Sequence, residues 1–531
     1  MTQPLLRVRD LSLDIYQTAI LRDVSFHIEA GEVLGIIGES GSGKSLTAFS
    51  LMQLLPKGSR LQGDISLGQT QLSALREREL QRYRGKELSM VFQEPMTALN
   101  PLQTIGDQVA ETVMLHQQLG KRRALEVARD TLNRVELPAK DFPLDRFPHE
   151  LSGGQRQRVV IAMAIALRPK LLIADEPTTA LDVTTQAQIL ELLRRLVDED
   201  NMACMMISHD LGLMANIADR VAIMKDGRVV EQGETSEVFS GQRHPYTRAL
   251  FAASRHIPER KTWGGGGEVL LELHRVHRYY KLPKRSLFAP QRYHQAVRQV
   301  SFKLYKGENL GLVGESGCGK STLSRAILAL DAIDSGSIKL KGHEIAQYKR
   351  VASRLPKALR RQIQVVFQDP YGSFNPRHRV ERLVAEPLCL SEEGLSVREK
   401  RHRVHTVLEE VGLSTRDSEK YIHEFSGGQR QRIAIARALI LRPELIVLDE
   451  AVSALDVSIR AQILDLLADL SGRLGLSYLF ISHDLAVVRA ITDRVLVMKD
   501  GEIVEEGPTE TVFRQAQHGY TRALIAASPN L

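Results

Sequence analysis

Two stretches of the sequence, GESGSGKS at Gly38–Ser45 and GESGCGKS at Gly314–Ser321, decide the fold. Each fits the pattern GxxxxGK[ST], whose glycines let successive backbone N–H groups converge on a phosphate. The apolar runs EVLGIIG and ENLGLVG precede them and predict buried strands, and KSLTAFSLMQLL and KSTLSRAILAL follow with helical spacing. The positive end of that helix adds to the attraction for an anion. The sequence therefore predicts two phosphate-binding loops.

In each loop the lysine, Lys44 or Lys320, is expected to reach the β- and γ-phosphates, and the hydroxyl of Ser45 or Ser321 to ligate Mg²⁺. The predicted ATP-binding residues are Gly38, Glu39, Ser40, Gly41, Ser42, Gly43, Lys44, Ser45, Gly314, Glu315, Ser316, Gly317, Cys318, Gly319, Lys320 and Ser321.

Other motifs of the sequence also occur twice. The two loop lysines lie 276 residues apart, Gln93 and Gln368 lie 275 apart, and the serines of LSGGQRQR and FSGGQRQR, Ser152 and Ser426, lie 274 apart. The order of the motifs is the same and the drift is only two residues. The chain is therefore a tandem duplication of a unit of about 250 residues, which we expect to be an α/β domain with a largely parallel sheet.

We place the first domain at residues 5–257, a glycine-rich linker at 258–268 and the second domain at 269–527. The linker contains TWGGGG, Thr262–Gly267, and four glycines favour a flexible coil. About 11 residues are inserted early in the second unit, in a basic and aromatic stretch near 281–294. That insertion is either a solvated hairpin between two strands or a contact with a membrane or partner.

Composition limits the other classes. The 531 residues are too many for one core, and 43% hydrophobic and 25% charged residues are typical of a globular protein. The net charge of +7 allows a nucleic acid or an anionic membrane as partner without requiring either. Three cysteines, far apart, argue against a disulfide framework and a zinc or iron–sulfur site. We expect no signal peptide and no membrane span, because the longest apolar runs are about half of the ~20 residues required.

Buried strands that end in acids supply the second part of the chemistry. KLLIADE and ELIVLDE place Asp175 and Asp449 at strand ends, where a carboxylate can hold the Mg²⁺ shell. The following acids, Glu176 and Glu450, are placed to accept a proton from an attacking water. The alternative, an acidic strand end that only caps a helix, is disfavoured by the phosphate loops upstream.

The SGGQ motifs discriminate between families. Ser152 and Ser426 are predicted helix N-caps, and the glycines behind them leave N–H groups open to an anion. With a phosphate loop upstream and DEP or DEA downstream, each half resembles an ATP-binding-cassette nucleotide-binding domain, over nearly the whole chain. The resemblance implies a P-loop α/β core, a helical subdomain and an antiparallel β subdomain in each half, with ATP and Mg²⁺ as cofactors.

In that family two cassettes form a head-to-tail dimer, and each ATP lies between one phosphate loop and the opposite signature. The resemblance therefore implies one site from Gly38–Ser45 with Ser426–Gln429, and another from Gly314–Ser321 with Ser152–Gln155. The signature residues are Ser152, Gly153, Gly154, Gln155, Ser426, Gly427, Gly428 and Gln429.

The remaining family positions carry over one at a time. The Q-loop glutamines, which touch Mg²⁺ and sense the transmembrane partner, are Gln93 and Gln368. The switch histidines are His209 and His483, the D-loop aspartates are Asp182 and Asp456, and the residues that stack on adenine are Tyr16 in the first half and Tyr279 or Tyr280 in the second. The second half has Ala451 and Val452 where Pro and Thr are usual, but Glu450 is retained, so we expect both sites to hydrolyse ATP.

Further short motifs point to one subfamily. FQEPMTALNP, FQDPYGSFNP and the endings HPYTRAL and HGYTRAL, from His244 and His518, resemble the ATPases of bacterial dipeptide, oligopeptide and nickel importers. Tandem fusion resembles the ATPases for glutathione uptake and for broad peptide and microcin C uptake. The resemblance implies two permease subunits, a periplasmic or extracellular solute-binding protein, no nucleic acid, and a peripheral place on the cytoplasmic face of the bacterial inner membrane. The alternative is a tandem-cassette ATPase that regulates translation on the ribosome.

Overall fold

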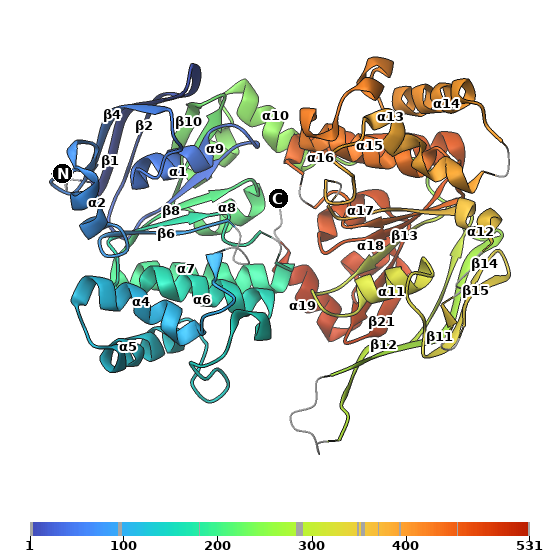
Figure 1. Ribbon diagram of the computed structural model, residues 1–531, viewed down its shortest axis with the longest axis horizontal. Helices are drawn as coiled ribbons and strands as arrows, with labels where there is room; N and C mark the ends of the chain where they lie inside the picture. The colour runs from blue at the N-terminus through green and yellow to red at the C-terminus, as the bar shows by residue number, and fades with distance from the viewer. Residues whose placement is uncertain are drawn as a thin grey trace. The chain divides into compact units, whose positions relative to one another are not determined.

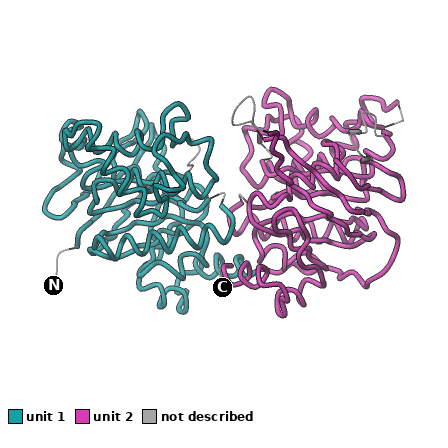
Figure 2. The backbone as a smooth tube through the Cα atoms, turned by 90° about the horizontal axis from the view of Figure 1, so that it is seen from below, with its two compact units in different colours: residues 1–255, 529–531 teal, residues 256–528 magenta. Residues whose placement is uncertain are grey.

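The chain folds into two compact units, one built from Met1–Arg255 and the other from His256–Ser528 (Figure 2). The computed structural model describes residues 4–93, 98–179, 181–282, 290–347, 350–351, 356–369, 371–391, 394–453 and 455–528. Each unit contains one predicted phosphate loop and one SGGQ motif, so the duplication in the sequence is a duplication of the fold.

The first unit holds two sheets. Its strands are β1 (Leu6–Ile15), β2 (Thr18–Ile28), β3 (Val33–Ile37), β4 (Ser59–Leu67), β5 (Thr70–Gln71), β6 (Leu88–Val91), β7 (Leu171–Asp175), β8 (Ala203–Ser208), β9 (Arg220–Lys225) and β10 (Arg228–Glu234). The core sheet has the order β10-β9-β3-β8-β7-β6, and all its pairs are parallel except β10 with β9. The smaller sheet, β2-β1-β4-β5, is antiparallel.

The helices of the first unit cover both faces of the core sheet. They are α1 (Lys44–Met52), α2 (Glu77–Tyr83), α4 (Ile105–Gln117), α5 (Lys121–Arg134), α6 (Gly153–Ile165), α7 (Val183–Asp200), α8 (Leu211–Ile217), α9 (Thr235–Gly241) and α10 (Pro245–Ser254). Within this unit, Figure 1 shows α4, α5 and α6 on one side of the core sheet and the antiparallel sheet on the other. Helices α4, α5 and α6 pack on one another as a helical subdomain.

The second unit repeats this architecture. Its strands are β11 (Val269–Lys281), β12 (Tyr293–Tyr305), β13 (Asn309–Val313), β14 (Ser335–Leu340), β15 (His343–Gln347), β16 (Arg350–Val351), β17 (Ile363–Val366), β18 (Leu445–Asp449), β19 (Ser477–Ile481), β20 (Arg494–Lys499) and β21 (Glu502–Pro508). The core order is β17-β18-β19-β13-β20-β21.

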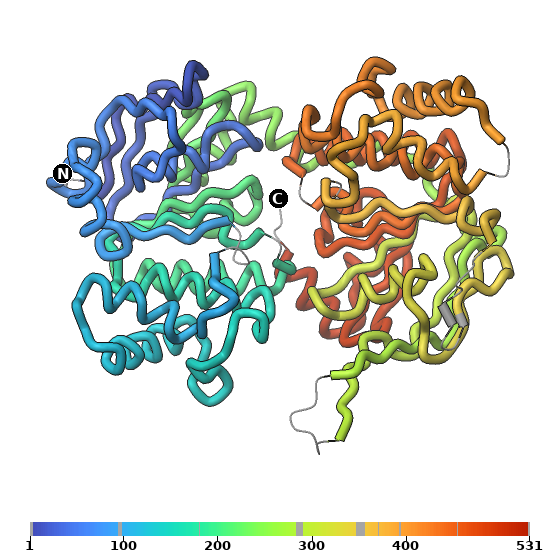
Figure 3. Tube along the Cα trace, in the orientation of Figure 1, coloured from blue at the N-terminus to red at the C-terminus, as the bar shows by residue number. Residues whose placement is uncertain are grey.

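Its helices are α11 (Lys320–Ile327), α12 (Lys357–Gln362), α13 (Val380–Ala385), α14 (Val397–Glu410), α15 (Gly427–Leu439), α16 (Val457–Leu474), α17 (Leu485–Ile491), α18 (Thr509–Arg514) and α19 (Gly519–Ala527). Strands β11 and β12 have 13 residues each and extend beyond the other strands of their sheet, as the trace in Figure 3 shows. The predicted insertion lies at the end of this hairpin, and its residues 283–289 lie outside the described part of the chain.

The core strands form where the sequence reads as short, continuous apolar runs. All five residues of β3, β7 and β13 are buried, as expected for strands covered on both faces. Because β3, β7 and β8 run parallel, their carboxyl ends meet at one edge of the sheet, which places the loops after Ile37, Asp175 and Ser208 together. The α/β class and both subdomains predicted from the sequence are confirmed.

The segment between the cassettes belongs structurally to the second unit. Arg260 pairs with the carboxylate of Asp493 and donates to the carbonyl of Thr492 at 2.7 Å. The indole of Trp263 stacks on Tyr305 with ring centroids 5.3 Å apart. Beyond it, Gly264–Gly267 have open space around their Cα atoms. Among the helices of the described residues, none combines the length and the apolar composition required to cross a membrane.

Candidate functional site

Each phosphate loop is closed by its own lysine. Lys44 Nζ donates to the carbonyls of Gly38 at 2.8 Å and Glu39 at 2.9 Å, and Lys320 Nζ makes the same bonds to Gly314 and Glu315 at 2.7 and 2.9 Å. The last loop glycine, Gly43 or Gly319, has a φ of 102° or 110°, a conformation that a side chain would strain.

The loops also lie close to a neighbouring strand. A Cβ on Gly38 would lie 2.4 Å from the carbonyl oxygen of Met224, the residue before the end of β9. On Gly314 it would lie 2.2 Å from the corresponding oxygen of Met498 on β20. The glycine pattern therefore reflects both the curl of the loop and its close contact with this strand.

The aspartates at the ends of β7 and β18 lie beside the loops. Ser45 Oγ donates to Asp175 Oδ1 at 3.2 Å. Burial raises the pKa of Asp175, and the hydrogen bond from Ser45 partly offsets that effect. Burial likewise raises the pKa of Asp449, but there the opposing hydrogen bond comes from Ser324, while the predicted ligand Ser321 is exposed. The first cassette thus brings two of its predicted Mg²⁺ ligands, Ser45 and Asp175, into direct contact.

The next residue, Glu176 or Glu450, adopts a left-handed backbone with φ of 47° or 50°. Non-glycine residues rarely adopt this region, and such strain concentrates at functional sites. The backbone N–H of each glutamate donates to the strand on its other side, to Ile207 at 3.0 Å and Ile481 at 2.9 Å. This turn directs the carboxylate out of the sheet and toward the loop edge.

Switch histidine and Q-loop glutamine converge on this carboxylate. His209 Nδ1 lies 3.0 Å from Glu176 Oε1, and Gln93 Nε2 donates to Oε2 at 3.1 Å. Although burial would raise the pKa of Glu176, the contacts with His209 lower it to about 2. The second cassette repeats the contacts: His483 Nδ1 lies 3.2 Å from Glu450 Oε1, and Gln368 Nε2 donates to Oε2 at 2.7 Å.

The two glutamates differ in one further contact. Thr179 Oγ1 donates to the carboxylate of Glu176 at 2.8 Å. The equivalent Ser453 instead donates to the backbone carbonyl of Glu450 at 2.9 Å. Burial would raise the pKa of Glu450 as well, and His483 lowers it below its ordinary value. The departures Ala451 and Val452 are buried and leave the carboxylate's contacts with His483 and Gln368 in place.

The signature serines are helix N-caps, as predicted. Ser152 Oγ accepts from the N–H of Gln155 at 3.3 Å, and Ser426 Oγ accepts from Gln429 at 3.4 Å, each within a capping box. The second glycine allows α7 or α16 to approach, because a Cβ on Gly154 would lie 2.4 Å from Thr185 and one on Gly428 2.5 Å from Ile459. Gly153 and Gly427 are exposed at the helix starts.

The predicted D-loop aspartates lie at helix starts, and the tyrosines predicted to stack on adenine are exposed. Asp182 caps α7 by accepting from the N–H of Thr185 at 3.0 Å, and Asp456 precedes α16 in the same position. Tyr16 is 78% exposed at the turn between β1 and β2, while Tyr279 and Tyr280 are each 37% exposed on β11. Their stacking on adenine stays a prediction.

Sequence reasoning missed two tyrosines that touch the phosphate loops. Tyr246 Oη accepts from the N–H of Glu39 at 3.3 Å, and Tyr520 Oη accepts from the N–H of Glu315 at 3.0 Å. Both belong to the endings HPYTRAL and HGYTRAL, which we interpreted only as subfamily markers. The recurrence of a tyrosine at the same place in both endings was the available signal.

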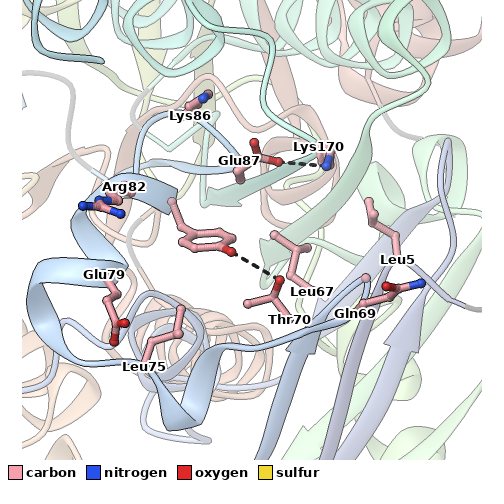
Figure 4. Close-up of a pocket in the computed structure, with 12 residues that line it drawn as sticks. Leu5, Leu67, Gln69, Thr70, Leu75, Glu79, Arg82, Lys86, Glu87 and Lys170 are labelled. Carbon is pink, nitrogen blue, oxygen red and sulfur yellow. Dashed lines mark hydrogen bonds and ion pairs between the residues drawn. The ribbon is translucent and has the colours of Figure 1, made fainter. Parts of the chain in front are cut away.

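A separate pocket of about 520 Å³ lies in the first unit, between the antiparallel sheet and α2 (Figure 4). Leu67 and Thr70 line it, with an ion pair of 3.0 Å between Glu87 and Lys170 at its rim. Its lining contains no residue of the phosphate loop, the acidic strand end or the signature, so it does not belong to the candidate site.

The site residues fit a nucleotide and its Mg²⁺. Each loop has the tight approach that only glycine permits, a buried lysine, and a helix whose first N–H groups face the loop. The hydroxyl of Ser45 and the carboxylate of Asp175 are hard oxygen donors of the kind that Mg²⁺ prefers.

Comparisons with known proteins identify the family. The ABC transporter family matches residues 21–179 and 297–453, and the C-terminal region of oligopeptide/dipeptide transporters matches 230–274 and 504–531. The glutathione import ATP-binding protein GsiA of Shigella boydii is 47% identical over 97% of this chain and 87% of its own length. The peptidoglycan transport ATP-binding protein YejF of Agrobacterium fabrum is 46% identical over 100% of this chain and 97% of its own.

Among solved structures, a dimeric ATP-binding cassette bound to ADP and Pi is 29% identical, with a TM-score of 0.40 over 45% of this chain and 99% of that one. The family matches cover the phosphate loop and the acidic strand end of both cassettes, and two relatives share nearly half of all residues along the whole chain. This chain is therefore a member of the ABC transporter family of ATPases, with two ATP-binding cassettes in one polypeptide.

Proposed function

We propose that this chain is the ATP-hydrolysing subunit of an importer for peptides or peptide-like compounds. The observation that carries the proposal is the oligopeptide/dipeptide transporter C-terminal region, which matches the end of both cassettes. The relatives whose names describe glutathione import and peptidoglycan transport support the same substrate class. Ribosomal regulation, the alternative considered from the sequence, has no support among these matches.

The chemistry proposed for each cassette follows from its contacts. The carboxylate of Glu176 or Glu450 accepts a proton from the attacking water, because it is held ionised beside the phosphate loop. His209 or His483 fixes that carboxylate from one side and Gln93 or Gln368 from the other. Lys44 and Lys320 leave their carbonyl partners for the β- and γ-phosphates.

The metal proposed for each site is Mg²⁺. Ser45, Asp175 and Gln93 would hold it in the first cassette, and Ser321, Asp449 and Gln368 in the second. When bound, the ion would neutralise charge that develops on the phosphate oxygens. In the second cassette Asp449 is hydrogen-bonded by Ser324, and Ser321 is exposed at the start of α11.

We further propose that ATP brings the phosphate loop of each cassette against the signature of the other. The exposed starts of α6 and α15, with N–H groups beside bare glycines, support an anion partner there. Two permease subunits would form the channel and a periplasmic or extracellular binding protein would deliver the substrate. The chain would then lie at the cytoplasmic face of the inner membrane, without contacting nucleic acid.

Co-purification from detergent extracts tests this function. The tagged chain should bring down two membrane proteins, and ATP hydrolysis by that assembly should rise when a peptide-loaded binding protein is added. Recovery of ribosomes instead of membrane proteins would refute the importer. A matched sample that carries Lys44→Ala and Lys320→Ala should keep the partners and lose hydrolysis, which separates assembly from catalysis.

A further inference from the structure

The segment that follows each core sheet reaches back to the phosphate loop through one tyrosine. Tyr246 is the second residue of α10 and Tyr520 is the second residue of α19. The hydroxyl of Tyr246 accepts from the backbone N–H of Glu39 and donates to its carboxylate Oε2 at 3.2 Å. These partners are 207 residues apart in sequence, and the equivalent pair in the second cassette is 205 apart.

A chain of contacts fixes the position of this tyrosine. In the first cassette, Glu231 on β10 accepts from the backbone N–H groups of Arg243 at 2.8 Å and His244 at 3.0 Å. His244 Nδ1 then accepts from the N–H of Tyr246 at 3.2 Å and caps the start of α10. The ammonium of Lys225, the last residue of β9, lies 4.9 Å from the tyrosine ring.

The second cassette repeats this arrangement at the corresponding positions of its own sequence. Glu505 on β21 accepts from the N–H groups of Gln517 at 2.7 Å and His518 at 3.1 Å. His518 Nδ1 accepts from the N–H of Tyr520 at 3.1 Å, and Lys499 lies 4.9 Å from the ring. Among these residues only Gln517 differs in type from its counterpart, Arg243, and both contribute through their backbone N–H groups. Two independent copies thus preserve one geometry that ends at the loop.

We propose that Tyr246 and Tyr520 are positioning residues that hold the second residue of each phosphate loop in the nucleotide-binding conformation. The hydroxyl accepts a hydrogen bond from the N–H of Glu39 or Glu315, close to the point where the loop leaves its strand. The loop glycines that follow have open or strained backbones, so this anchor limits the conformations that the loop can adopt. The endings HPYTRAL and HGYTRAL are therefore part of the ATP site.

The expected consequence is a change in nucleotide affinity. If the anchor is lost, a smaller fraction of loops is competent to bind, and the apparent dissociation constant rises in proportion. The hydroxyl of Tyr246 contacts the loop at Glu39, whereas His209 and Thr179 hold the carboxylate of Glu176, so turnover at saturation should be nearly unchanged. This inference rests on the proposed binding of ATP to both loops.

Tyr246→Phe tests the anchor, because it removes the hydroxyl and keeps the ring over Lys225. In the full chain with Glu450→Gln, so that hydrolysis comes from the first site, KM for ATP should rise about 2–10-fold, the usual worth of one hydrogen bond. The kcat should stay within about 2-fold. Tyr520→Phe in the Glu176→Gln background should behave in the same way.

A matched control is Tyr83→Phe, because the hydroxyl of Tyr83 lies 3.3 Å from Thr70 Oγ1 in the pocket of Figure 4, away from the loop. It should leave KM unchanged. If Tyr246→Phe also leaves KM unchanged, or if both variants raise it equally, the anchor is refuted. The parent chain must bind a fluorescent ATP analogue, and Lys44→Ala must weaken that binding; if these two conditions fail, the ATP sites themselves are wrong.

Discussion

At the scale of single residues, the most informative feature is the backbone of the two glutamates. Glu176 and Glu450 sit at positive φ directly after a fully extended strand. A left-handed non-glycine residue costs about 1–3 kcal/mol, so the fold must over-determine the turn. The N–H bonds to Ile207 and Ile481 do this, and each carboxylate is then received by a histidine and a glutamine. The strain therefore directs the acid toward the loop.

Replacing both acids should separate binding from hydrolysis. In Glu176→Gln with Glu450→Gln the amide keeps its size but cannot accept the proton, so hydrolysis should fall roughly 10²–10⁴-fold while ATP still binds. Each single variant should retain partial turnover, because His483 and Gln368 hold Glu450 despite Ala451 and Val452. Full activity of Glu450→Gln together with a dead Glu176→Gln would show that the second site is degenerate. Phosphate release and filter binding measure the two properties.

The pH dependence of the first site should be controlled by His209. Because contacts with His209 lower the pKa of Glu176 to about 2, its carboxylate stays ionised well below the ordinary glutamate range. In His209→Ala, burial still raises the pKa of Glu176, but the contact that lowers this pKa most is lost. The acid limb of the pH profile of kcat should therefore move to higher pH. The profile is measured with Glu450→Gln present. His483→Ala in that background should leave the limb where it was.

The sequence allowed most of these residues to be predicted, because motif spacing fixes which strand end or helix start each one occupies. It did not predict Thr179 as a partner of Glu176, since a hydroxyl three residues after an acid has no pattern of its own. It also missed Tyr246, because a contact that spans 207 residues is set by the fold and not by local spacing.

At the scale of elements, the two cassettes differ in how they hold one aspartate. Asp219 accepts from the N–H of Val33 at 2.8 Å and pairs with Arg194 of α7 at 2.8 Å. Asp493, 274 residues later, accepts from Asn309 in the same way, but the residue of α16 that corresponds to Arg194 is Ala468, which is 3% exposed. The missing arginine is supplied by Arg260 of the linker.

Arg260→Ala should therefore destabilise the second cassette far more than Arg194→Ala destabilises the first. The side chains of Arg260 and Asp493 are only 15% and 7% exposed, and removal of one buried partner costs about 3 kcal/mol. Those of Arg194 and Asp219 are 37% and 42% exposed, where a pair contributes about 0–1 kcal/mol. Urea unfolding of each variant measures the difference.

Trp263 reports on the linker in the same experiment, because it is the chain's single tryptophan and stacks on Tyr305. Its accessibility to acrylamide should rise in Arg260→Ala and stay unchanged in Arg194→Ala. Equal losses of stability, or an unaltered tryptophan, would contradict the linker's role. The sequence showed the glycines of this segment but not its docking, because the role of Arg260 depends on Asp493, 233 residues later in the chain, and on the alanine at position 468.

At the scale of the whole molecule, the tandem fusion matters if each ATP needs a phosphate loop from one cassette and a signature from the other. The native Cys318 is a poor probe of that arrangement. It is 7% exposed, and burial raises the pKa of its thiol, which slows oxidation. Ser316 in the same loop is exposed, as are Gly153 and Gly427 at the two signature helices. A Cβ at Gly427 meets nothing within 4 Å, and one at Gly153 meets only Leu181, at 3.4 Å.

We expect Ser316→Cys to form a disulfide with Gly153→Cys and not with Gly427→Cys. In both variants, the one with Gly153→Cys and the one with Gly427→Cys, all three native cysteines are replaced by Ser. Both variants also carry Glu176→Gln and Glu450→Gln, so that bound ATP is not consumed. A disulfide requires Cα atoms about 4.4–6.8 Å apart, so it reports contact between loops and not general proximity. The link should appear with MgATP under mild oxidation, shift mobility on a non-reducing gel, and disappear when Lys320→Ala removes nucleotide from that loop. A link to position 427 and none to 153 would mean that each cassette closes its own site, and the duplication would then supply two independent ATPases instead of two halves of each site.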